Sequence, residues 1–281
     1  MIYILYVFYQ NKAKVPDEYL SLDTNQFKII IFDNSTDDQY LKYNESYCKL
    51  HHFYYLTERK NIGLSRAYNL AIKTFITEDD YLLILDADTR IRKEYLDLLL
   101  EKIKENKYEV FSPININSKT KEIDSPLKII WNPLFVSEKV NLKSQNYDYF
   151  KVINNGVTIK GSALKKIGYF DERIFLYFSD SYLSYQLYSH HIKTLVINYE
   201  NECNFSFDTL DHSLLKKRLR IMKRDGYTFY KIIYKKEKKS RFLAMIHYQM
   251  FCFKKAKECC LATNKKYFLS YLLSGKEKKI T

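Results

Sequence analysis

The feature that most constrains the fold is an alternation of short apolar runs and helix-like segments over the first 115 residues. The runs have the length and the β-branched or aromatic composition of buried strands. They are Ile2–Tyr9, Lys28–Phe32, His52–Leu56, Tyr81–Leu85 and Glu109–Ser112. Between them, Leu64–Phe75 and Lys93–Glu105 have helical spacing. The alternation predicts an α/β fold with a mostly parallel central sheet covered by helices on both faces.

Charge is distributed unevenly along the chain. The formal net charge is +13 over 281 residues, yet residues 1–213 hold 26 Lys and Arg against 29 Asp and Glu. Residues 214–281 hold 20 against 4. We therefore predict a slightly acidic domain over 1–213 and a basic helical tail over 214–281. The helices expected in the tail are Leu214–Tyr234, Arg241–Leu261 and Lys266–Leu273.

Several protein classes are excluded by what the sequence lacks. Its six glycines do not form a dinucleotide fingerprint or a P-loop. Its five cysteines have no zinc-ligand spacing and are typical of reduced cytosolic thiols. The longest stretches without charged residues, Ser181–Ile192 and Phe242–Phe253, are shorter than the roughly 20 residues that cross a bilayer. We expect a cytoplasmic protein, peripheral at the inner face of the plasma membrane.

Polar residues follow three of the predicted strands. Asp33 ends the second, Asn61 and Gly63 follow the third, and Asp86 and Asp88 follow the fourth. Ligands of open parallel sheets bind beyond the carboxyl ends of the strands, although each residue taken singly also suits a turn or a helix cap. Continued strand geometry would point Asp86 and Asp88 to one side. Two such carboxylates repel unless a cation lies between them, which predicts a site for a hard divalent ion with oxygen ligands.

Four segments carry a family resemblance. In order, they are IIIFDNSTDD, NIGLSRAYNLAI, LLILDADTRI and GVTIKGSALKKIGYFDERIFLYFSDSYLSYQL. Together they resemble family 2 glycosyltransferases with the GT-A fold, in the bacterial rhamnosyltransferase-like branch. The resemblance spans roughly residues 2–200. It implies a nucleotide-sugar half over 1–115 and an acceptor half over 116–213.

The resemblance also implies roles for the residues at the strand ends. Asp33 would accept a hydrogen bond from the uracil or thymine ring. Asn61 and Gly63 would shape the nucleotide pocket. Asp86 would lie near the ribose or the metal, and Asp88 would hold the Mg²⁺ or Mn²⁺ that bridges the diphosphate of the donor.

Asp180 takes the place of the catalytic base of the family, within Phe175–Leu187. The family usually has Glu, Asp, Asp and Arg in this segment, whereas this chain has Ser179, Asp180, Tyr182 and Gln186. The base candidate is therefore present without its charged neighbours. An acid in the first turn of a helix is also favoured by the helix dipole alone.

The reaction implied is an inverting transfer of a sugar, rhamnose included, from a UDP- or dTDP-sugar. The acceptor would be a saccharide or a lipid-linked precursor in bacterial surface polysaccharide synthesis. A carboxylate must take the proton of the attacking hydroxyl, and a divalent ion must neutralise the leaving diphosphate.

Other interpretations stay open at this point. The Lys- and Tyr-rich tail suits nucleic acid, an anionic membrane, or packing on the catalytic domain. A nucleotidyltransferase would also use paired acids and a metal, but the glycine-rich basic loop expected for triphosphate binding is missing.

Overall fold

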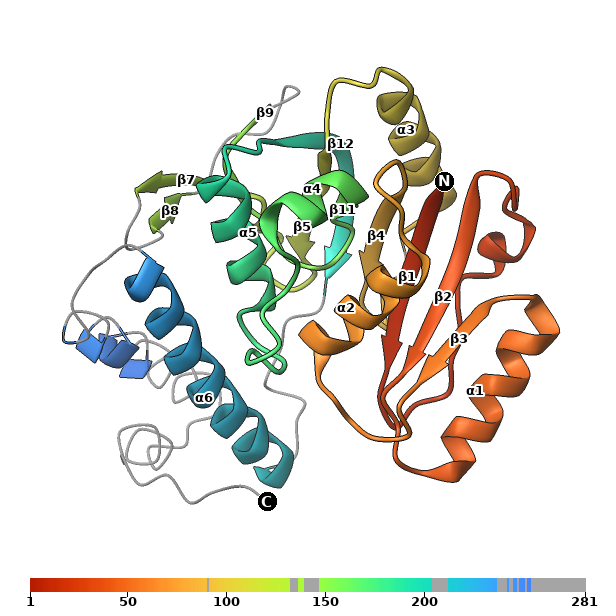
Figure 1. Cartoon of the computed structure of the whole chain (residues 1–281), viewed down its shortest axis with the longest axis horizontal. Coiled ribbons are helices and arrows are strands. Elements are labelled where there is room, and N and C mark those ends of the chain that lie inside the picture. The colour runs from red at the N-terminus through yellow and green to blue at the C-terminus, as the bar shows by residue number, and fades with distance from the viewer. Residues whose placement is uncertain are drawn as a thin grey trace. The chain divides into compact units, whose positions relative to one another are not determined.

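The computed structural model describes residues 1–89, 91–131, 136–138, 147–203 and 212–236, and residues 242, 245–246, 248–250 and 252–253. The chain forms two compact units (Figure 1). Met1–Phe175 and Ser179–Asn204 make the first, and Leu176–Phe178 and Phe205–Thr281 make the second. The predicted domain boundary at residue 213 stays a prediction.

The first unit is built on a large sheet. Its strands are β1 (Ile2–Phe8), β2 (Phe27–Asp33), β3 (Tyr54–Thr57), β4 (Tyr81–Leu85), β5 (Val110–Asn117), β6 (Ile123–Ser125), β9 (Tyr147–Asp148), β11 (Thr158–Lys160) and β12 (Thr194–Cys203). Over the described residues their order is β3-β2-β1-β4-β11-β5-β12-β9, with β6 paired to β5. A smaller sheet has the order β10 (Phe150–Lys151), β7 (Leu127–Trp131) and β8 (Val136–Glu138).

Most pairings in the centre of the large sheet are parallel. Strands β3, β2, β1 and β4 run in one direction, and β5 and β12 are parallel to each other. Strand β11 lies antiparallel between β4 and β5. The predicted mostly parallel sheet is therefore confirmed, with one reversed strand at its centre.

Helices cover both faces of this sheet. They are α1 (Asp38–His51), α2 (Leu64–Phe75), α3 (Lys93–Lys104), α4 (Gly161–Ile167) and α5 (Ser179–Ser189), with the short 3₁₀ helix η1 (Asp17–Ser21). Successive strand residues face opposite sides, so Leu5 and Leu82 pack with α2, α4 and α5, whereas Ile4 and Leu83 pack with α1 and α3. The prediction of helices on both faces is confirmed (Figure 1).

The parallel register places the ends of three strands at one edge. Phe8 of β1 pairs with Asp33 of β2, and Tyr6 of β1 pairs with Leu85 of β4. The polar segments that follow β2 and β4 therefore leave the sheet from the same edge. This is where the candidate site forms.

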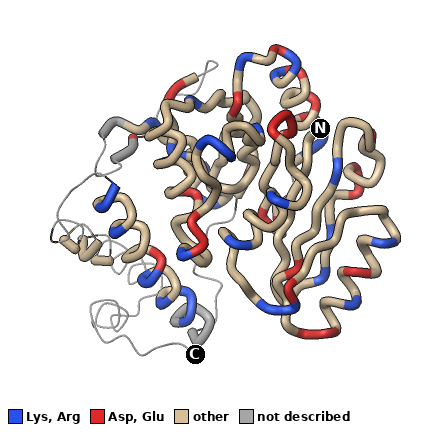
Figure 2. Tube along the Cα trace, viewed as in Figure 1, with Lys and Arg blue, Asp and Glu red and all other residues tan. Residues whose placement is uncertain are grey.

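The second unit contains α6 (His212–Lys236), two residues longer at each end than the predicted helix Leu214–Tyr234. The described residues between 242 and 253 are also helical. The rest of the predicted helix Arg241–Leu261, and all of Lys266–Leu273, lie outside the described residues. Figure 2 shows basic residues along α6, and the sequence of this helix has a single acidic residue, Asp225. In the part of the chain that the structure describes, none of the helices has the length and hydropathy needed to cross a bilayer.

Candidate active site

Asp33, at the end of β2, has no exposed surface. Its Oδ1 accepts a hydrogen bond from the Ser35 amide (2.9 Å). Its Oδ2 accepts from Asn44 Nδ2 (2.7 Å) and from the Tyr55 hydroxyl (3.1 Å). A buried carboxylate needs such donors because water cannot reach it. In this structure Asp33 fixes the loop after β2, and its contact with a nucleotide base stays a prediction.

Asn34 joins that loop to the segment before α2. Its Nδ2 donates to the Gly63 carbonyl oxygen (3.3 Å), and its Oδ1 accepts from the Ile62 amide (3.2 Å). Asn61 closes the same segment, because its Oδ1 accepts from the Gly63 amide (3.0 Å). Asn34 received no role in the sequence analysis, although it directly follows Asp33.

Only glycine fits at position 63. Its φ of +82° lies in the left-handed region, and a Cβ there would lie 2.5 Å from the Phe175 carbonyl oxygen. That oxygen also accepts from the Leu64 amide (2.6 Å). The predicted nucleotide loop is therefore held against the residue that begins the Phe175–Leu187 segment.

Asp86 and Asp88 lie in a turn and not on a continued strand. Strand β4 ends at Leu85, and the Thr89 amide donates to the Asp86 carbonyl oxygen (3.0 Å). The expectation that strand alternation orients the two carboxylates is therefore wrong. Asp86 is partly exposed and Asp88 is exposed, so both can meet a ligand.

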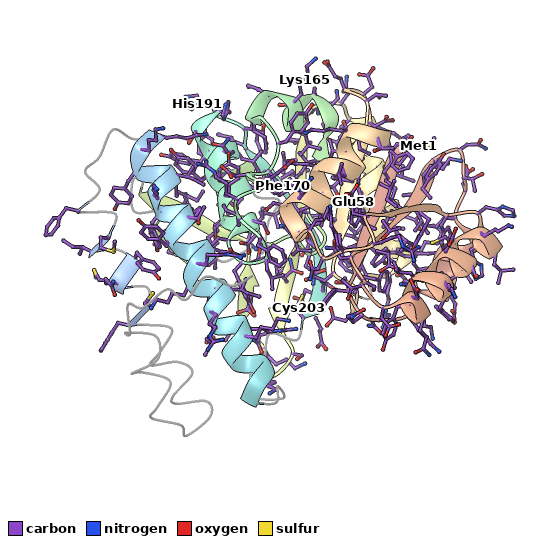
Figure 3. All side chains as sticks on the ribbon, turned by 60° about the horizontal axis from the view of Figure 1, so that its bottom comes forward. Met1, Glu58, Lys165, Phe170, His191 and Cys203 are labelled. Atoms are coloured by element: carbon purple, nitrogen blue, oxygen red, sulfur yellow. The ribbon has the colours of Figure 1, made fainter. Side chains whose placement is uncertain are left out.

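A buried amide cluster anchors the end of this turn. The Thr89 hydroxyl donates to Asn155 Oδ1 (2.5 Å), whose Nδ2 donates to Cys203 Sγ (3.1 Å). Asn115 Nδ2 donates to the Asn155 carbonyl oxygen (3.1 Å), and Asn201 Nδ2 donates to Asn115 Oδ1 (2.7 Å). Cys203 lies at the end of β12 (Figure 3). Sequence analysis missed this cluster, for which the Asn154-Asn155-Gly156 turn sequence was the available signal.

The charge of Asp180 affects the pKa of a residue in the acidic turn. Burial, followed by the charges of Asp88 and Asp180, raises the pKa of Asp86 to about 7. Burial also raises the pKa of Tyr68 well above its usual range, with further contributions from Asp86 and Asp180. Two carboxylates of the turn after β4 and one carboxylate of α5 thus interact unfavourably. Among the described residues, no Lys or Arg forms an ion pair with any of them.

The residues that depart from the family pattern in α5 are engaged within the first unit. Tyr182 is buried, and burial, together with the charge of Asp171, raises its pKa to about 12 despite the opposing effect of Arg173. Gln186 Nε2 donates to the Ile167 carbonyl oxygen at the end of α4 (2.7 Å). Asp180 is partly exposed, and its Oδ1 accepts from the Ser181 amide (2.6 Å).

The acidic turn fits a divalent ion that shares its coordination with a ligand. Among the residues that the structure describes, no three His, Cys, Asp or Glu side chains form a metal cage. Asp86 and Asp88 supply two hard oxygen donors on an accessible turn and repel each other. Mg²⁺ typically binds one or two carboxylates and completes its shell with water and substrate phosphates. The donor set therefore suits an ion shared with a diphosphate.

Comparison with known families identifies the chain. The model of glycosyl transferase family 2 matches residues 11–166, which is more than half of the sequence. The chain belongs to glycosyl transferase family 2. The matched segment contains Asp33, Asn61, Gly63 and the acidic turn, whereas Asp180 lies beyond it. No curated protein sequence matches the chain.

Several solved structures share the fold of this family 2 chain. Crystal structures of S. aureus TarS 1–349 and of its UDP-GlcNAc complex are 15% and 14% identical to it, with TM-scores of 0.54 and 0.55. The alignments cover 80% of this chain and 64% and 66% of TarS 1–349. GalNAc-T7 with UDP, GalNAc and Mn²⁺ is 14% identical, with a TM-score of 0.52 over 82% of this chain and 50% of that one. The GT-A fold is confirmed, and this chain spans less than two thirds of these relatives.

Proposed function

We propose that this family 2 protein is an inverting, metal-dependent glycosyltransferase that uses a UDP- or dTDP-sugar. The acceptor is a saccharide or a lipid-linked precursor in bacterial surface polysaccharide synthesis, and rhamnose is one candidate sugar. The observation that carries the proposal is that the charges of Asp88 and Asp180 both act on Asp86, which directly follows β4. Repulsion between neighbouring carboxylates decreases when a cation binds next to them. Such an acidic site therefore favours the binding of a divalent ion.

The donor half of the site contains the acidic turn and the loops after β2 and β3. Asp88 and Asp86 would hold Mn²⁺ or Mg²⁺, which supplies positive charge to neutralise the leaving diphosphate. Asn61 and Gly63 would line the nucleotide pocket, and Asp33 would keep its loop in place. The UDP-GlcNAc complex of TarS and the Mn²⁺ complex of GalNAc-T7 support a nucleotide-sugar donor and a divalent ion.

Asp180 would act on the acceptor. A sugar hydroxyl is a poor nucleophile, so a carboxylate within hydrogen-bond reach must accept its proton as the new glycosidic bond forms. The bond between the anomeric carbon and the diphosphate oxygen breaks in the same displacement. The proton stays on Asp180, the electron pair leaves with the nucleoside diphosphate, and the configuration of the anomeric carbon inverts.

Donor binding can be tested without a known acceptor. At 100 times the Kd, a ligand stabilises the folded state by about 2.7 kcal/mol. For a chain of this size, that corresponds to a rise in Tm of roughly 5 °C or more. A thermal-shift screen of UDP- and dTDP-sugars should therefore show one donor whose stabilisation requires Mn²⁺ or Mg²⁺. Equal melting temperatures across the whole panel, with and without metal, would contradict the proposal.

The tail offers a surface for an anionic membrane that holds a lipid-linked acceptor. In its second helical segment, Phe242, Met245, Ile246, Met250 and Phe253 are exposed, whereas Tyr248 and Cys252 are buried. The exposed residues recur at helical spacing and so share one side of the helix. Residues 214–281 carry 20 Lys and Arg against 4 Asp and Glu. An apolar helix side in a basic region suits a bilayer of anionic lipids.

A vesicle assay tests this surface. The full-length protein should float with vesicles containing anionic lipid and not with neutral vesicles, and high salt should weaken the binding. Replacing both Phe242 and Phe253 with Ala should reduce vesicle binding by about tenfold or more, since each Phe side chain that becomes buried in the bilayer contributes about 1.5–3 kcal/mol. Leu50→Ala is the matched control, because Leu50 is 72% exposed on α1 and Phe242 is 73% exposed. Tighter binding to an oligonucleotide than to anionic vesicles would instead favour nucleic acid as the partner.

A further inference from the structure

Helix α6 contains an unusual buried charge. Asp225 is the one acidic residue between His212 and Lys236, against nine Lys and Arg. The basic residues that surround it in the sequence would suit an exposed helix, yet Asp225 has no exposed surface. A carboxylate buried in this way is costly unless hydrogen bonds and opposite charge compensate it. The partners of Asp225 therefore indicate what it does.

Those partners are two backbone amides and one guanidinium group. Asp225 Oδ2 accepts from the Leu176 amide (2.7 Å) and from the Tyr177 amide (3.0 Å). Asp225 Oδ1 accepts from Arg224 Nε (3.1 Å) and Nη2 (2.9 Å). Hydrogen bonds to an ionised acceptor are stronger than those between neutral groups. One side chain of α6 thus fixes two consecutive residues that lie almost fifty positions earlier in the chain.

The next residue in that segment, Phe178, has a strained backbone. Its φ of +68° lies in the left-handed region, which is unfavourable for a bulky side chain. Such conformations persist where the surrounding structure imposes them, and they gather at functional sites. The Phe178 ring packs on Phe229 of α6, with the ring centres 5.2 Å apart. Helix α6 therefore holds this segment both through the Asp225 carboxylate and through an aromatic contact.

The segment held by α6 leads directly into the base candidate. Phe178 is bonded to Ser179, the first residue of α5, and Asp180 follows. On the other side, Phe175 receives the hydrogen bond from the Leu64 amide beside Gly63. The backbone between the nucleotide loop and Asp180 is therefore fixed in its middle by Asp225. A reacting carboxylate displaced by about 1 Å can lose a factor of about 100 in rate.

We propose that Asp225 is a positioning residue for transfer, which sets the place of Asp180 through the backbone of Leu176–Phe178. This inference rests on the proposed function, in which Asp180 accepts the proton of the acceptor hydroxyl. Asp225 itself does not touch the substrate. It makes the rate of transfer depend on the C-terminal unit, although the nucleotide loop and the acidic turn both belong to the first unit.

The test compares Asp225→Ala with Ile233→Ala in the full-length protein. Both residues are buried in α6, but only the Asp225 side chain can accept the hydrogen bonds of Leu176 and Tyr177, since Ile233 has no polar side-chain group. Asp225→Ala should lower kcat by about 10- to 100-fold while the KM for the donor and the Kd for UDP with Mn²⁺ stay near wild type. Ile233→Ala should lower the Tm without changing kcat. Asp225→Asn should lose less activity than Asp225→Ala, because its amide oxygen can still accept from Leu176 and Tyr177 while its NH₂ group faces Arg224.

Hydrogen exchange gives a second measurement that needs no substrate. The amides of Leu176 and Tyr177 should lose protection in Asp225→Ala and keep it in Ile233→Ala. Unchanged protection in Asp225→Ala, or an equal loss of kcat in both variants, overturns the proposal. Failure of the proposed function can be distinguished from failure of this inference. In the first case the wild-type protein would show no transfer with any donor, and the hydrogen-exchange result would still decide whether Asp225 fixes the segment.

Discussion

Replacement of Asp180 with Asn should remove sugar transfer and leave donor binding nearly unchanged. An amide has almost the shape of the carboxylate but cannot accept the proton of the acceptor hydroxyl. General-base catalysis of this kind contributes about 10²- to 10⁴-fold, and we expect kcat to fall by this amount. The nucleotide loop and the acidic turn stay intact, so the Kd for UDP with Mn²⁺ should remain close to wild type. The measurements are steady-state transfer kinetics and calorimetric titration of UDP.

The control for this prediction is Asp97→Asn on α3, which also removes one negative charge. Asp97 is exposed and pairs with Lys93 within the same helix, so its loss should affect neither kcat nor UDP binding. Transfer that persists in Asp180→Asn at the wild-type rate would place the base elsewhere. Loss of UDP binding together with transfer would mean that Asp180 supports the donor and not the acceptor.

Replacement of Asp88 with Asn should abolish metal-dependent turnover. Asp88 is the exposed carboxylate of the turn after β4, and the amide oxygen that replaces it carries no charge to attract a divalent ion. The ion is expected to stabilise the leaving diphosphate by several kcal/mol. Transfer at a fixed Mn²⁺ concentration should therefore fall by about 10²-fold or more. The thermal stabilisation by donor with Mn²⁺ should be lost as well.

Asp79→Asn provides the matched control for the acidic turn. Asp79 is also exposed and lies just before β4, so the strand separates it from the site at the other end. This variant should keep its dependence on Mn²⁺ and its rate. A full response of Asp88→Asn to Mn²⁺, with wild-type turnover, would show that the ion binds without this carboxylate.

Local sequence patterns predicted much of the fold. Helix α2 covers Leu64–Phe75 and β4 covers Tyr81–Leu85, both as expected, because each signal depends only on neighbouring positions and their spacing. Helix α1 received no prediction, and its apolar positions are sparse, with Leu41, Asn44 and Cys48 as its buried residues. A helix with so weak a pattern is stabilised mainly by the sheet against which it packs.

The geometry of the site was less accessible to sequence reasoning. The spacing of Asp86 and Asp88 predicted a shared side of a strand, but the chain turns at once through the Thr89–Asp86 hydrogen bond. Asp33 has the sequence position of a ligand-binding residue, yet Asn44 and Tyr55 enclose its carboxylate. Such partners come from other elements, so no local pattern reveals them.

The sequence by itself determined that the chain forms an α/β sheet with acidic residues after its strands and a basic C-terminal part. These properties follow from periodicity and composition, which act within a few residues. Only the tertiary structure decided that Asp180 lies within electrostatic range of Asp86, and that Asp225 binds the backbone before α5. These contacts join distant parts of the chain, and they form because packing of the whole core fixes where each element lies.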